Sequence, residues 1–297
     1  LGREWQFRPG AVGSRDWERS RLAALYALAQ GDAPVVVATA DGLMARTLPP
    51  ETLRSLAITL EVGGQAELGA LAEQLLSAGY TRCEQVEGVG QFALRGGILD
   101  VFSPLMDQPV RCEFFDDEID SMGAFDPGTQ RRTRNVSSAR ILPAAEVLPH
   151  CAPGGLPGLA DQLIALAEKL AKKQKTEAIV QTLREDAERL RSGAAPGAAD
   201  RYLAAIYPTV TAGVHYLPPD AVVFLSESGR VDERVKNTVL QQKQDVEALL
   251  SAGVLAGEYA HLTLTAEELY AALEDFPVIL EDSLPTSRHP LRPRGLL

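Results

Sequence analysis

The chain has 297 residues, of which 45% are hydrophobic and 23% are charged, and its formal net charge at pH 7 is −11. This composition is typical of a soluble globular protein with two or three domains and argues against a disordered chain. The acidic balance also argues against a protein whose main role is to coat nucleic acid, although it leaves room for a local basic patch.

The cysteines and the N-terminus indicate the compartment. The chain has three cysteines, Cys83, Cys112 and Cys151, and none of them forms a CxxC pair. This odd number without a pair favours a reducing compartment without a disulfide framework or a structural zinc. The first residues lack the apolar segment of a signal peptide, and no apolar run reaches the length of about 18 residues that a membrane span needs. We therefore expect a cytoplasmic protein that does not bind a membrane.

Residues 1–56 predict alternating helices and strands. Apolar residues recur at helical spacing over Ser14–Gln30, and the apolar run Val35–Ala38 predicts a buried strand. Short helical segments are expected at Asp41–Arg46 and after Leu48, where prolines occupy the first turn. This order of elements is typical of an α/β layer with a parallel sheet.

Residues 57–143 follow a different pattern. Alternation over Ile58–Val62 predicts a strand, and Gln65–Ala78 is an amphipathic helix that Gly79 ends. Short alternating runs separated by glycine-rich turns then continue to Ile141, as in a small antiparallel sheet. A helix followed by such a sheet predicts a separate α+β module.

Residues 144–297 return to the α/β pattern. We expect one or two helices over Leu156–Arg191, a strand at Ala221–Leu225 and a helix over Val231–Leu250. A capping box at Thr265–Glu268 predicts a further helix, and Pro277–Leu280 predicts a third short buried strand. The simplest architecture is one parallel-sheet α/β domain built from both chain ends, residues 1–56 and 144–297, with the α+β module 57–143 inserted.

No catalytic motif stands out in the chain. A phosphate-binding loop of the form GxxxxGK[ST] requires a Gly-Lys pair, and the 297 residues contain none. The acidic run Asp116–Glu118 could hold a metal, but acidic residues at a turn are usually solvated. We therefore expect no catalytic residue, no metal and no cofactor, and a binding function rather than an enzyme.

The segment Pro109–Asp120 carries the most information about binding. Because side chains of a strand alternate between its two faces, the inward positions are Val110, Cys112 and Phe114. Arg111 and Phe115 then point outward. An outward phenylalanine that is never covered costs about 2 kcal/mol.

A preceding strand adds a third outward residue. Phe92 and Leu94 share the inward parity there, so Arg95 should project outward. Arginines grouped with an aromatic ring are typical anchors of a protein–protein interface. The alternative is that each arginine only extends over the sheet with its charge in water. The pattern by itself leaves both interpretations open.

Two runs within the α+β module also resemble a known family. GQFALRGGILDVFSP (90–104) and PVRCEFFDDEIDSMGAFDPGTQR (109–131) resemble the module shared by the excision-repair protein UvrB and the bacterial transcription-repair coupling factor. Ile141–Pro149 and Tyr216–Leu225 resemble the coupling factor in particular. The resemblance covers nearly the whole chain and is most specific over Gly79–Pro143.

The resemblance implies a fold and a partner. It implies a degenerate RecA/UvrB-like domain without working ATPase motifs, and a first α/β part that starts before Leu1. It implies that the module binds UvrA through two arginines and a phenylalanine, which fall on Arg95, Arg111 and Phe115. RNA polymerase and DNA would be reached only through parts of a longer protein outside this chain, and no small-molecule ligand is expected.

The expected function is therefore the recruitment of UvrA to a stalled RNA polymerase for nucleotide excision repair of the transcribed strand. One departure from the family pattern is Ser103, which stands where a proline more often follows the phenylalanine. Two alternatives remain. The chain could be a fragment of a UvrB-like DNA-dependent ATPase, or a scaffold whose sheet face is covered within the molecule.

Overall fold

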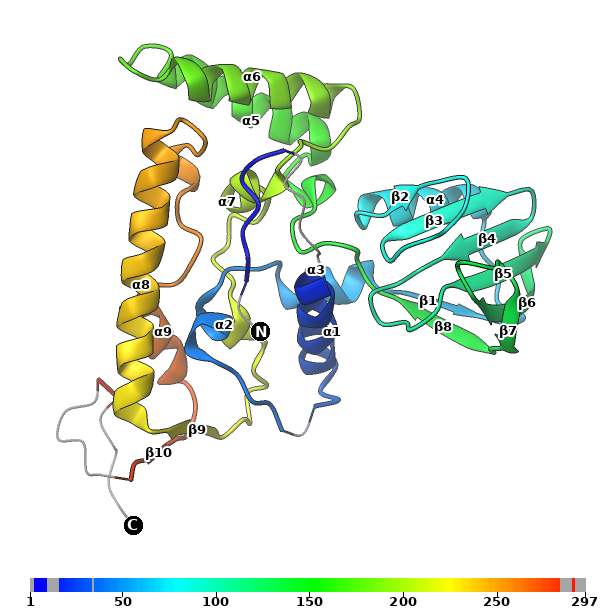
Figure 1. The fold of residues 1–297 in the computed structure, drawn as a ribbon, viewed down its shortest axis with the longest axis horizontal. Helices are drawn as coiled ribbons and strands as arrows, with labels where there is room; N and C mark the ends of the chain where they lie inside the picture. The colour runs from blue at the N-terminus through cyan, green and yellow to red at the C-terminus, as the bar shows by residue number, and fades with distance from the viewer. Residues whose placement is uncertain (1–2, 10–15, 34, 284–289, 292–297) are drawn as a thin grey trace. The chain divides into compact units, whose positions relative to one another are not determined.

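The computed structural model describes residues 3–9, 16–33, 35–283 and 290–291 (Figure 1). It is a mixed α/β protein that divides into two compact units. The first unit comprises Leu1–Gly13, Leu28–Pro49 and Ala152–Leu297, and the second comprises Ser14–Ala27 and Pro50–Cys151. In this division most of the first helix groups with the β-rich module. The boundaries expected after residues 56 and 143 stay a prediction.

The second unit is built on a six-stranded sheet whose spatial order follows the chain. Its strands are β2 (Thr81–Arg82), β3 (Gln91–Arg95), β4 (Ile98–Val101), β5 (Val110–Phe115), β6 (Glu118–Phe125) and β7 (Arg132–Asn135). All neighbours are antiparallel except β2 and β3, which pair in parallel through Thr81 and Gln91. The expectation of a purely antiparallel sheet is wrong at this edge, because the loop after β2 returns the chain to the same end of the sheet before β3 begins.

A two-stranded antiparallel sheet and a helix complete this unit. The strands are β1 (Ile58–Glu61) and β8 (Ser138–Ile141), and the helix is α4 (Leu68–Ser77), so the predicted strand and helix are confirmed. The helix begins later than predicted because the side chain of Glu67 accepts hydrogen bonds from two backbone amides of the first turn, at 2.7 Å each.

Gly79 ends α4 as predicted. Its φ is +85°, its amide donates to the carbonyl of Leu76 at 3.1 Å, and the amide of Tyr80 donates to that of Leu75 at 3.0 Å. This pair of bonds is a Schellman ending, which needs a left-handed residue and therefore favours glycine.

The core of the second unit lies between α4 and the inner face of the sheet. Its members are apolar side chains of β1, β3–β6, β8 and α4, among them Leu60, Leu71, Leu75, Phe92, Leu99, Val101, Val110, Cys112, Ile119, Met122 and Ile141. Ile119 and Met122 both face inward although they are three residues apart. A bulge in the β5–β6 pairing, where Asp120 has no counterpart in β5, accounts for this spacing.

Buried polar contacts also hold the second unit together. α1 (Asp16–Gln30) contributes Arg21, whose Nε lies 3.2 Å from a carboxylate oxygen of Glu146. Ser103, where the sequence departs from the family pattern, is fully buried, and its hydroxyl accepts a hydrogen bond from the amide of Leu142 at 3.0 Å. The short helix α3 (Pro50–Leu56) precedes β1.

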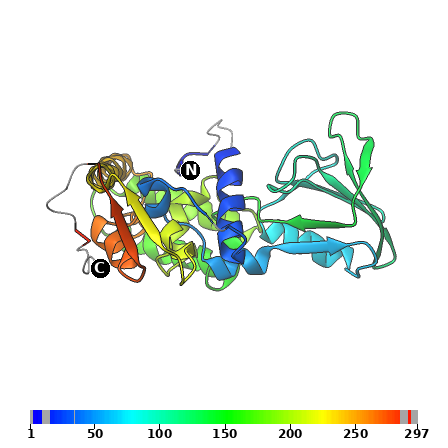
Figure 2. The same cartoon turned by 90° about the horizontal axis from the view of Figure 1, so that it is seen from below.

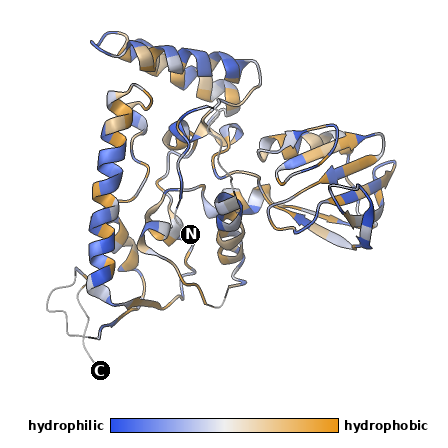
Figure 3. Ribbon diagram, viewed as in Figure 1, coloured by the Kyte–Doolittle hydropathy of each residue, from blue (hydrophilic) through white to orange (hydrophobic). Residues whose placement is uncertain are grey.

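The first unit is mainly helical. The region predicted as one or two helices forms two, α5 (Gly155–Leu170) and α6 (Glu177–Arg191). The other helices of this unit are α2 (Ala40–Met44), α7 (Leu203–Ile206), α8 (Ser228–Ser251) and α9 (Ala266–Leu273). Single 3₁₀ turns of this unit are η2 (Ala199–Tyr202), η3 (Gly213–Tyr216) and η4 (Gly257–Tyr259), whereas η1 (Pro149–Cys151) ends the second unit. Figure 3 shows hydrophilic and hydrophobic residues mixed along α8. Among the described residues, no helix is long and apolar enough to cross a membrane.

The capping box of α9 is confirmed. The hydroxyl of Thr265 accepts a hydrogen bond from the amide of Glu268 at 3.1 Å, and the carboxylate of Glu268 accepts one from the amide of Thr265 at 2.7 Å. Burial opposes ionisation of Glu268, but these hydrogen bonds and His261 outweigh it and lower the pKa of Glu268 below its usual 4.5.

The parallel sheet is smaller than predicted. Figure 2 shows β9 (Val223–Ser226) and β10 (Val278–Glu281) side by side, and they pair in parallel. The strand predicted at Val35–Ala38 is wrong: the segment is in no described strand, and the side chains of Val35 and Val37 are 81% and 94% exposed. An apolar run becomes a buried strand only where a neighbouring strand and a covering layer exist, and no described strand pairs with this run.

The outer positions of the short sheet are not buried either. Ile279 of β10 is 45% exposed, so the burial predicted for the strand at Pro277–Leu280 is wrong, and Phe224 of β9 is 63% exposed. The RecA-like arrangement expected for the flanking parts stays a prediction. The described part of the chain is mixed α/β, with a six-stranded mixed sheet, the antiparallel pair β1–β8 and the parallel pair β9–β10.

Candidate functional site

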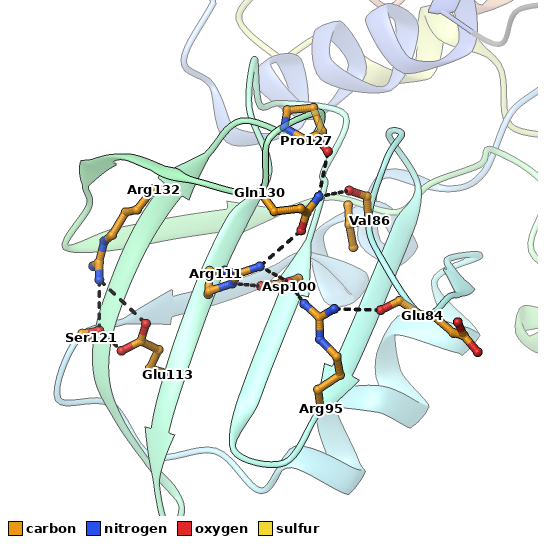
Figure 4. Close-up of polar contacts among 10 residues, drawn as sticks. All are labelled: Glu84, Val86, Arg95, Asp100, Arg111, Glu113, Ser121, Pro127, Gln130 and Arg132. Carbon is orange, nitrogen blue, oxygen red and sulfur yellow. Dashed lines mark hydrogen bonds and ion pairs between the residues drawn. The ribbon is translucent and has the colours of Figure 1, made fainter.

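The predicted arginines lie near each other on the outer face of the six-stranded sheet. In the register of the sheet, Ala93 of β3 pairs with Asp100 of β4, and Asp100 pairs with Arg111 of β5. Arg95 is two residues along β3 from Ala93, so its side chain leaves the same face. Figure 4 shows the two arginines converging from either side on Asp100.

Asp100 binds both arginines. Nε and Nη2 of Arg111 donate to its two carboxylate oxygens at 2.7 Å each, and Nη2 of Arg95 donates to Oδ2 at 2.7 Å. Asp100 is fully buried, whereas the side chains of Arg111 and Arg95 are 24% and 48% exposed. Two positive charges therefore share one negative charge, and the cluster presents a net charge of +1 to the outside.

The pKa values of Arg111 and Cys112 are both raised, for different reasons. The hydrogen bonds to Asp100 raise the pKa of Arg111, against the opposing effect of burial, so the guanidinium stays charged. Burial, with a smaller contribution from the negative charge of Asp100, raises the pKa of Cys112 to about 12. The Cys112 thiol, which lies in the core of the second unit, is thus protonated at neutral pH and is a poor nucleophile.

Loops on either side add further support to the arginines. Nη2 of Arg111 donates to Oε1 of Gln130 at 3.3 Å, and Nε2 of Gln130 donates to the carbonyls of Pro127 at 2.7 Å and Val86 at 3.2 Å. Nη1 of Arg95 donates to the carbonyl of Glu84 at 3.1 Å. The loop before β3 and the turn before β7 are therefore tied to the same charged cluster (Figure 4).

The turn that carries Gln130 is itself fixed by a side chain. Oδ1 of Asp126 accepts hydrogen bonds from the amide and the hydroxyl of Thr129, at 2.7 and 2.8 Å, and the amide of Gln130 donates to the carbonyl of Asp126 at 2.7 Å. The two contacts from Thr129 lower the pKa of Asp126. Gln130 has a φ of +60°, an uncommon conformation for a residue with a side chain, and these hydrogen bonds help to hold it.

A small apolar cluster covers part of the outer face beside Arg111. Its members are Val86, Ala93, Phe102 and Phe125. The guanidinium carbon of Arg111 lies 4.7 Å from the ring centre of Phe125, within the range of a cation–π contact. Arg111 is therefore fixed from three directions: by Asp100, by Gln130 and by this ring.

Phe115 lies at the far end of the same face. It is the last residue of β5, it pairs with Glu118 across the Asp116–Asp117 turn, and it is 76% exposed. At about 3.3 Å per residue, it lies about 13 Å along β5 from Arg111. A phenylalanine this exposed leaves most of its apolar area in water, an arrangement that favours a covering partner.

Phe115 is followed by the acidic run Asp116–Glu118, which belongs to no candidate metal-binding group of the described residues. Among them, no group of three or more His, Cys, Asp or Glu side chains lies close enough to hold a metal ion. Between this turn and the arginine cluster, Glu113 accepts a hydrogen bond from Ser121 at 3.0 Å and lies 3.9 Å from Arg132.

The outward orientation predicted for Arg95, Arg111 and Phe115 is confirmed, while their binding role stays a prediction. Sequence reasoning missed Asp100 and Gln130. For Asp100 a signal existed: a single carboxylate between Leu99 and Val101 in a short apolar strand is costly unless it is paired. For Gln130 we find no such signal, because a loop position becomes part of the cluster only through the fold.

Known proteins resemble this chain in two ways. Residues 58–146 match the family described as the UvrB interaction domain. Over longer stretches the chain is similar to proteins named transcription-repair-coupling factor: 30% identical over 246 residues to that of Bacillus subtilis (strain 168), 39% over 176 residues to that of Myxococcus xanthus, and 28% over 268 residues to that of Staphylococcus aureus (strain USA300).

These alignments cover 82%, 58% and 87% of this chain but only 21%, 14% and 22% of the three relatives. The chain thus spans about a fifth of the length of the Bacillus subtilis and Staphylococcus aureus relatives.

The second unit therefore contains a UvrB interaction domain, the module that carries the arginine cluster and Phe115. The chain as a whole belongs to the transcription-repair-coupling factor family and corresponds to its N-terminal region.

Proposed function

We propose that this chain binds UvrA through the outer face of the six-stranded sheet. As part of a longer protein it would recruit UvrA to a stalled RNA polymerase for nucleotide excision repair of the transcribed strand. The observation that carries the proposal is the pairing of two features on one face: Arg95 and Arg111 fixed by a buried carboxylate, and Phe115 left 76% exposed.

The physical reasons favour a protein partner for this face. Arginines held in place lose little side-chain entropy on binding, which strengthens the contacts that they make. Their excess positive charge suits acidic or carbonyl groups of a partner, to which guanidinium groups make charge-assisted hydrogen bonds. The ring of Phe115 would enter an apolar pocket, and the loss of such an anchor costs about 2 kcal/mol or more of binding energy.

Purified UvrA and this chain test the proposal by biolayer interferometry. Arg95→Ala, Arg111→Ala and Phe115→Ala should each weaken binding by about tenfold or more. Two substitutions serve as matched controls and should bind as the parent does. Arg134→Ala removes an exposed arginine from β7 of the same sheet, and Phe224→Ala removes an exposed phenylalanine from β9.

Circular dichroism of each variant confirms that the chain is folded. Folded variants that all bind UvrA as tightly as the parent would contradict the site. A parent chain that does not bind UvrA at all would contradict the function.

We also propose that this region is not catalytic, and that RNA polymerase and DNA are contacted only by other parts of the longer protein. The lack of any Gly-Lys pair in the 297 residues supports this, since a phosphate-binding loop of the P-loop type requires one. An assay of ATP hydrolysis, with and without DNA, tests it. Turnover by the isolated chain above background would favour a fragment of a UvrB-like DNA-dependent ATPase.

A further inference from the structure

We infer that Asp100 is a positioning residue of the partner-binding face, whose role is to set the direction and the charge of Arg95 and Arg111 together. The inference rests on the proposed function, because the contacts it sets up are those with UvrA.

The location of Asp100 makes a purely structural role a poor explanation. It lies in the middle strand of the three that carry the cluster, and its neighbours Leu99 and Val101 are fully buried in the core. A buried carboxylate costs free energy that even a good ion pair often only offsets, and apolar replacements of such pairs are often as stable or more so. A fold that needed only stability would not require a charge at this position.

The contacts of Asp100 couple the two arginines. Oδ1 accepts from Arg111 alone, whereas Oδ2 accepts from both Arg95 and Arg111, with all three distances 2.7 Å. Without the carboxylate the two guanidinium groups, which both lie 2.7 Å from Oδ2 of Asp100, would be like charges close together and would repel each other. One residue thus holds together two side chains from strands that are not neighbours in the sheet.

This arrangement also decides which donors remain for a partner. Within the described part of the chain, no group accepts a hydrogen bond from Nη1 of Arg111 or from Nε of Arg95. Both arginines are partly exposed, so these nitrogens can meet carboxylate or carbonyl oxygens of UvrA. Asp100, the carbonyl of Glu84 and Gln130 accept the hydrogen bonds from the other nitrogens, and the cluster of Asp100 and the two arginines keeps an excess of one positive charge.

The first test is Asp100→Asn, which keeps the size of the side chain and removes its charge. UvrA binding should weaken by about tenfold, the range expected when a charge-assisted hydrogen bond is lost. A double-mutant cycle separates positioning from a general effect on the fold. In a chain that already carries Arg95→Ala and Arg111→Ala, Asp100→Asn should change the remaining binding by less than about twofold, because Asp100 acts only through those arginines.

The second test does not need UvrA, and its first measurement uses the parent chain. In proton–nitrogen NMR spectra of the parent chain, the Nε–H signal of Arg111 should exchange with water much more slowly than that of the exposed Arg134. Asp100→Asn should abolish the difference. Equal exchange rates for Arg111 and Arg134 in the parent chain would overturn the inference, even if the variant failed to fold.

These outcomes distinguish the inference from the proposed function. A parent chain with a protected Arg111 signal but no UvrA binding would refute the proposed function and, with it, the binding role of Asp100. A parent that binds UvrA through Arg95 and Arg111, with a folded Asp100→Asn variant that binds equally well or better, would refute the inference alone.

Discussion

Arg111 and Asp100 are registered neighbours on β5 and β4, and two nitrogens of the guanidinium each lie 2.7 Å from a different oxygen of the carboxylate. A two-point contact of this kind fixes the plane of the guanidinium as well as its position. The ring centre of Phe125 lies 4.7 Å from the guanidinium carbon, within the range of a cation–π contact. Shape, and not charge alone, therefore determines which residue can occupy position 111.

The first prediction is that Arg111→Lys is not a conservative substitution. A lysine keeps the charge, but its ammonium group cannot make the two parallel hydrogen bonds to Asp100 or lay a guanidinium group over the ring of Phe125. UvrA binding should weaken by about tenfold although the net charge is unchanged. The measurement is an equilibrium titration with purified UvrA. Arg131→Lys, an exposed arginine next to β7, is the control and should bind as the parent does. Equal affinities for the Arg111→Lys variant and the parent would show that charge suffices.

The second prediction is that Phe115 contributes to binding and not to stability. Because it is 76% exposed, Phe115→Ala should change the free energy of unfolding by no more than about 0.5 kcal/mol. Phe92, from the same sheet, is fully buried, so Phe92→Ala should cost about 3–5 kcal/mol. Urea unfolding followed by circular dichroism measures both. A large loss of stability from Phe115→Ala would indicate that the ring is covered within the molecule, as the scaffold alternative requires.

The third prediction concerns the turn after α4. Gly79 has a φ of +85°, and a β-carbon added there would lie 2.8 Å from Cδ2 of the buried Leu148. Gly63 has nearly the same φ, +82°, but no atom within 4 Å of the added carbon. Gly79→Ala should therefore lower the free energy of unfolding by about 1 kcal/mol or more beyond the strain that both variants share. Thermal unfolding of the two variants gives the comparison. If both lose the same stability, the close approach of Leu148 has no energetic effect.

The fourth prediction is an acid-sensitive contribution from the capping box of α9. The folded pKa of Glu268 is below the usual 4.5, so the stabilisation from its charge is complete above that value and is lost as the pH falls through the lower folded pKa. Glu268→Gln should therefore be less stable than the parent at neutral pH by about 0.5 kcal/mol, and the two should converge in acid. Unfolding temperatures measured at several pH values give the difference. A gap that stays constant as the pH falls would contradict a role for the charge.

The errors of the sequence-based fold have a common physical origin. The run Val35–Ala38 has the apolar composition of a buried strand, and Phe224 lies in a run of the same kind. Composition indicates a preference for an extended backbone, but burial depends on a pairing neighbour and a covering layer. The first segment has no paired neighbour among the described residues, and β9 has one side exposed.

The elements that were predicted correctly depend on short-range rules. Glycine at position 79 ends α4 because a left-handed residue is required within two residues of the last turn. The box at Thr265 and Glu268 begins α9 because two side chains three residues apart satisfy two backbone amides. Alternation along β5 placed Arg111 and Phe115 on one face, since a strand repeats every two residues.

The sequence by itself thus determined the family, the faces of the strands, and the three outward residues Arg95, Arg111 and Phe115. Only the tertiary structure decided that Asp100 holds the two arginines and that Gln130 completes the cluster. The reason is that alternation specifies a face within one strand, whereas the register between strands brings residues 5, 11 and 19 positions apart into contact. That register follows from how β3, β4 and β5 pair over a shared core, which no single strand encodes.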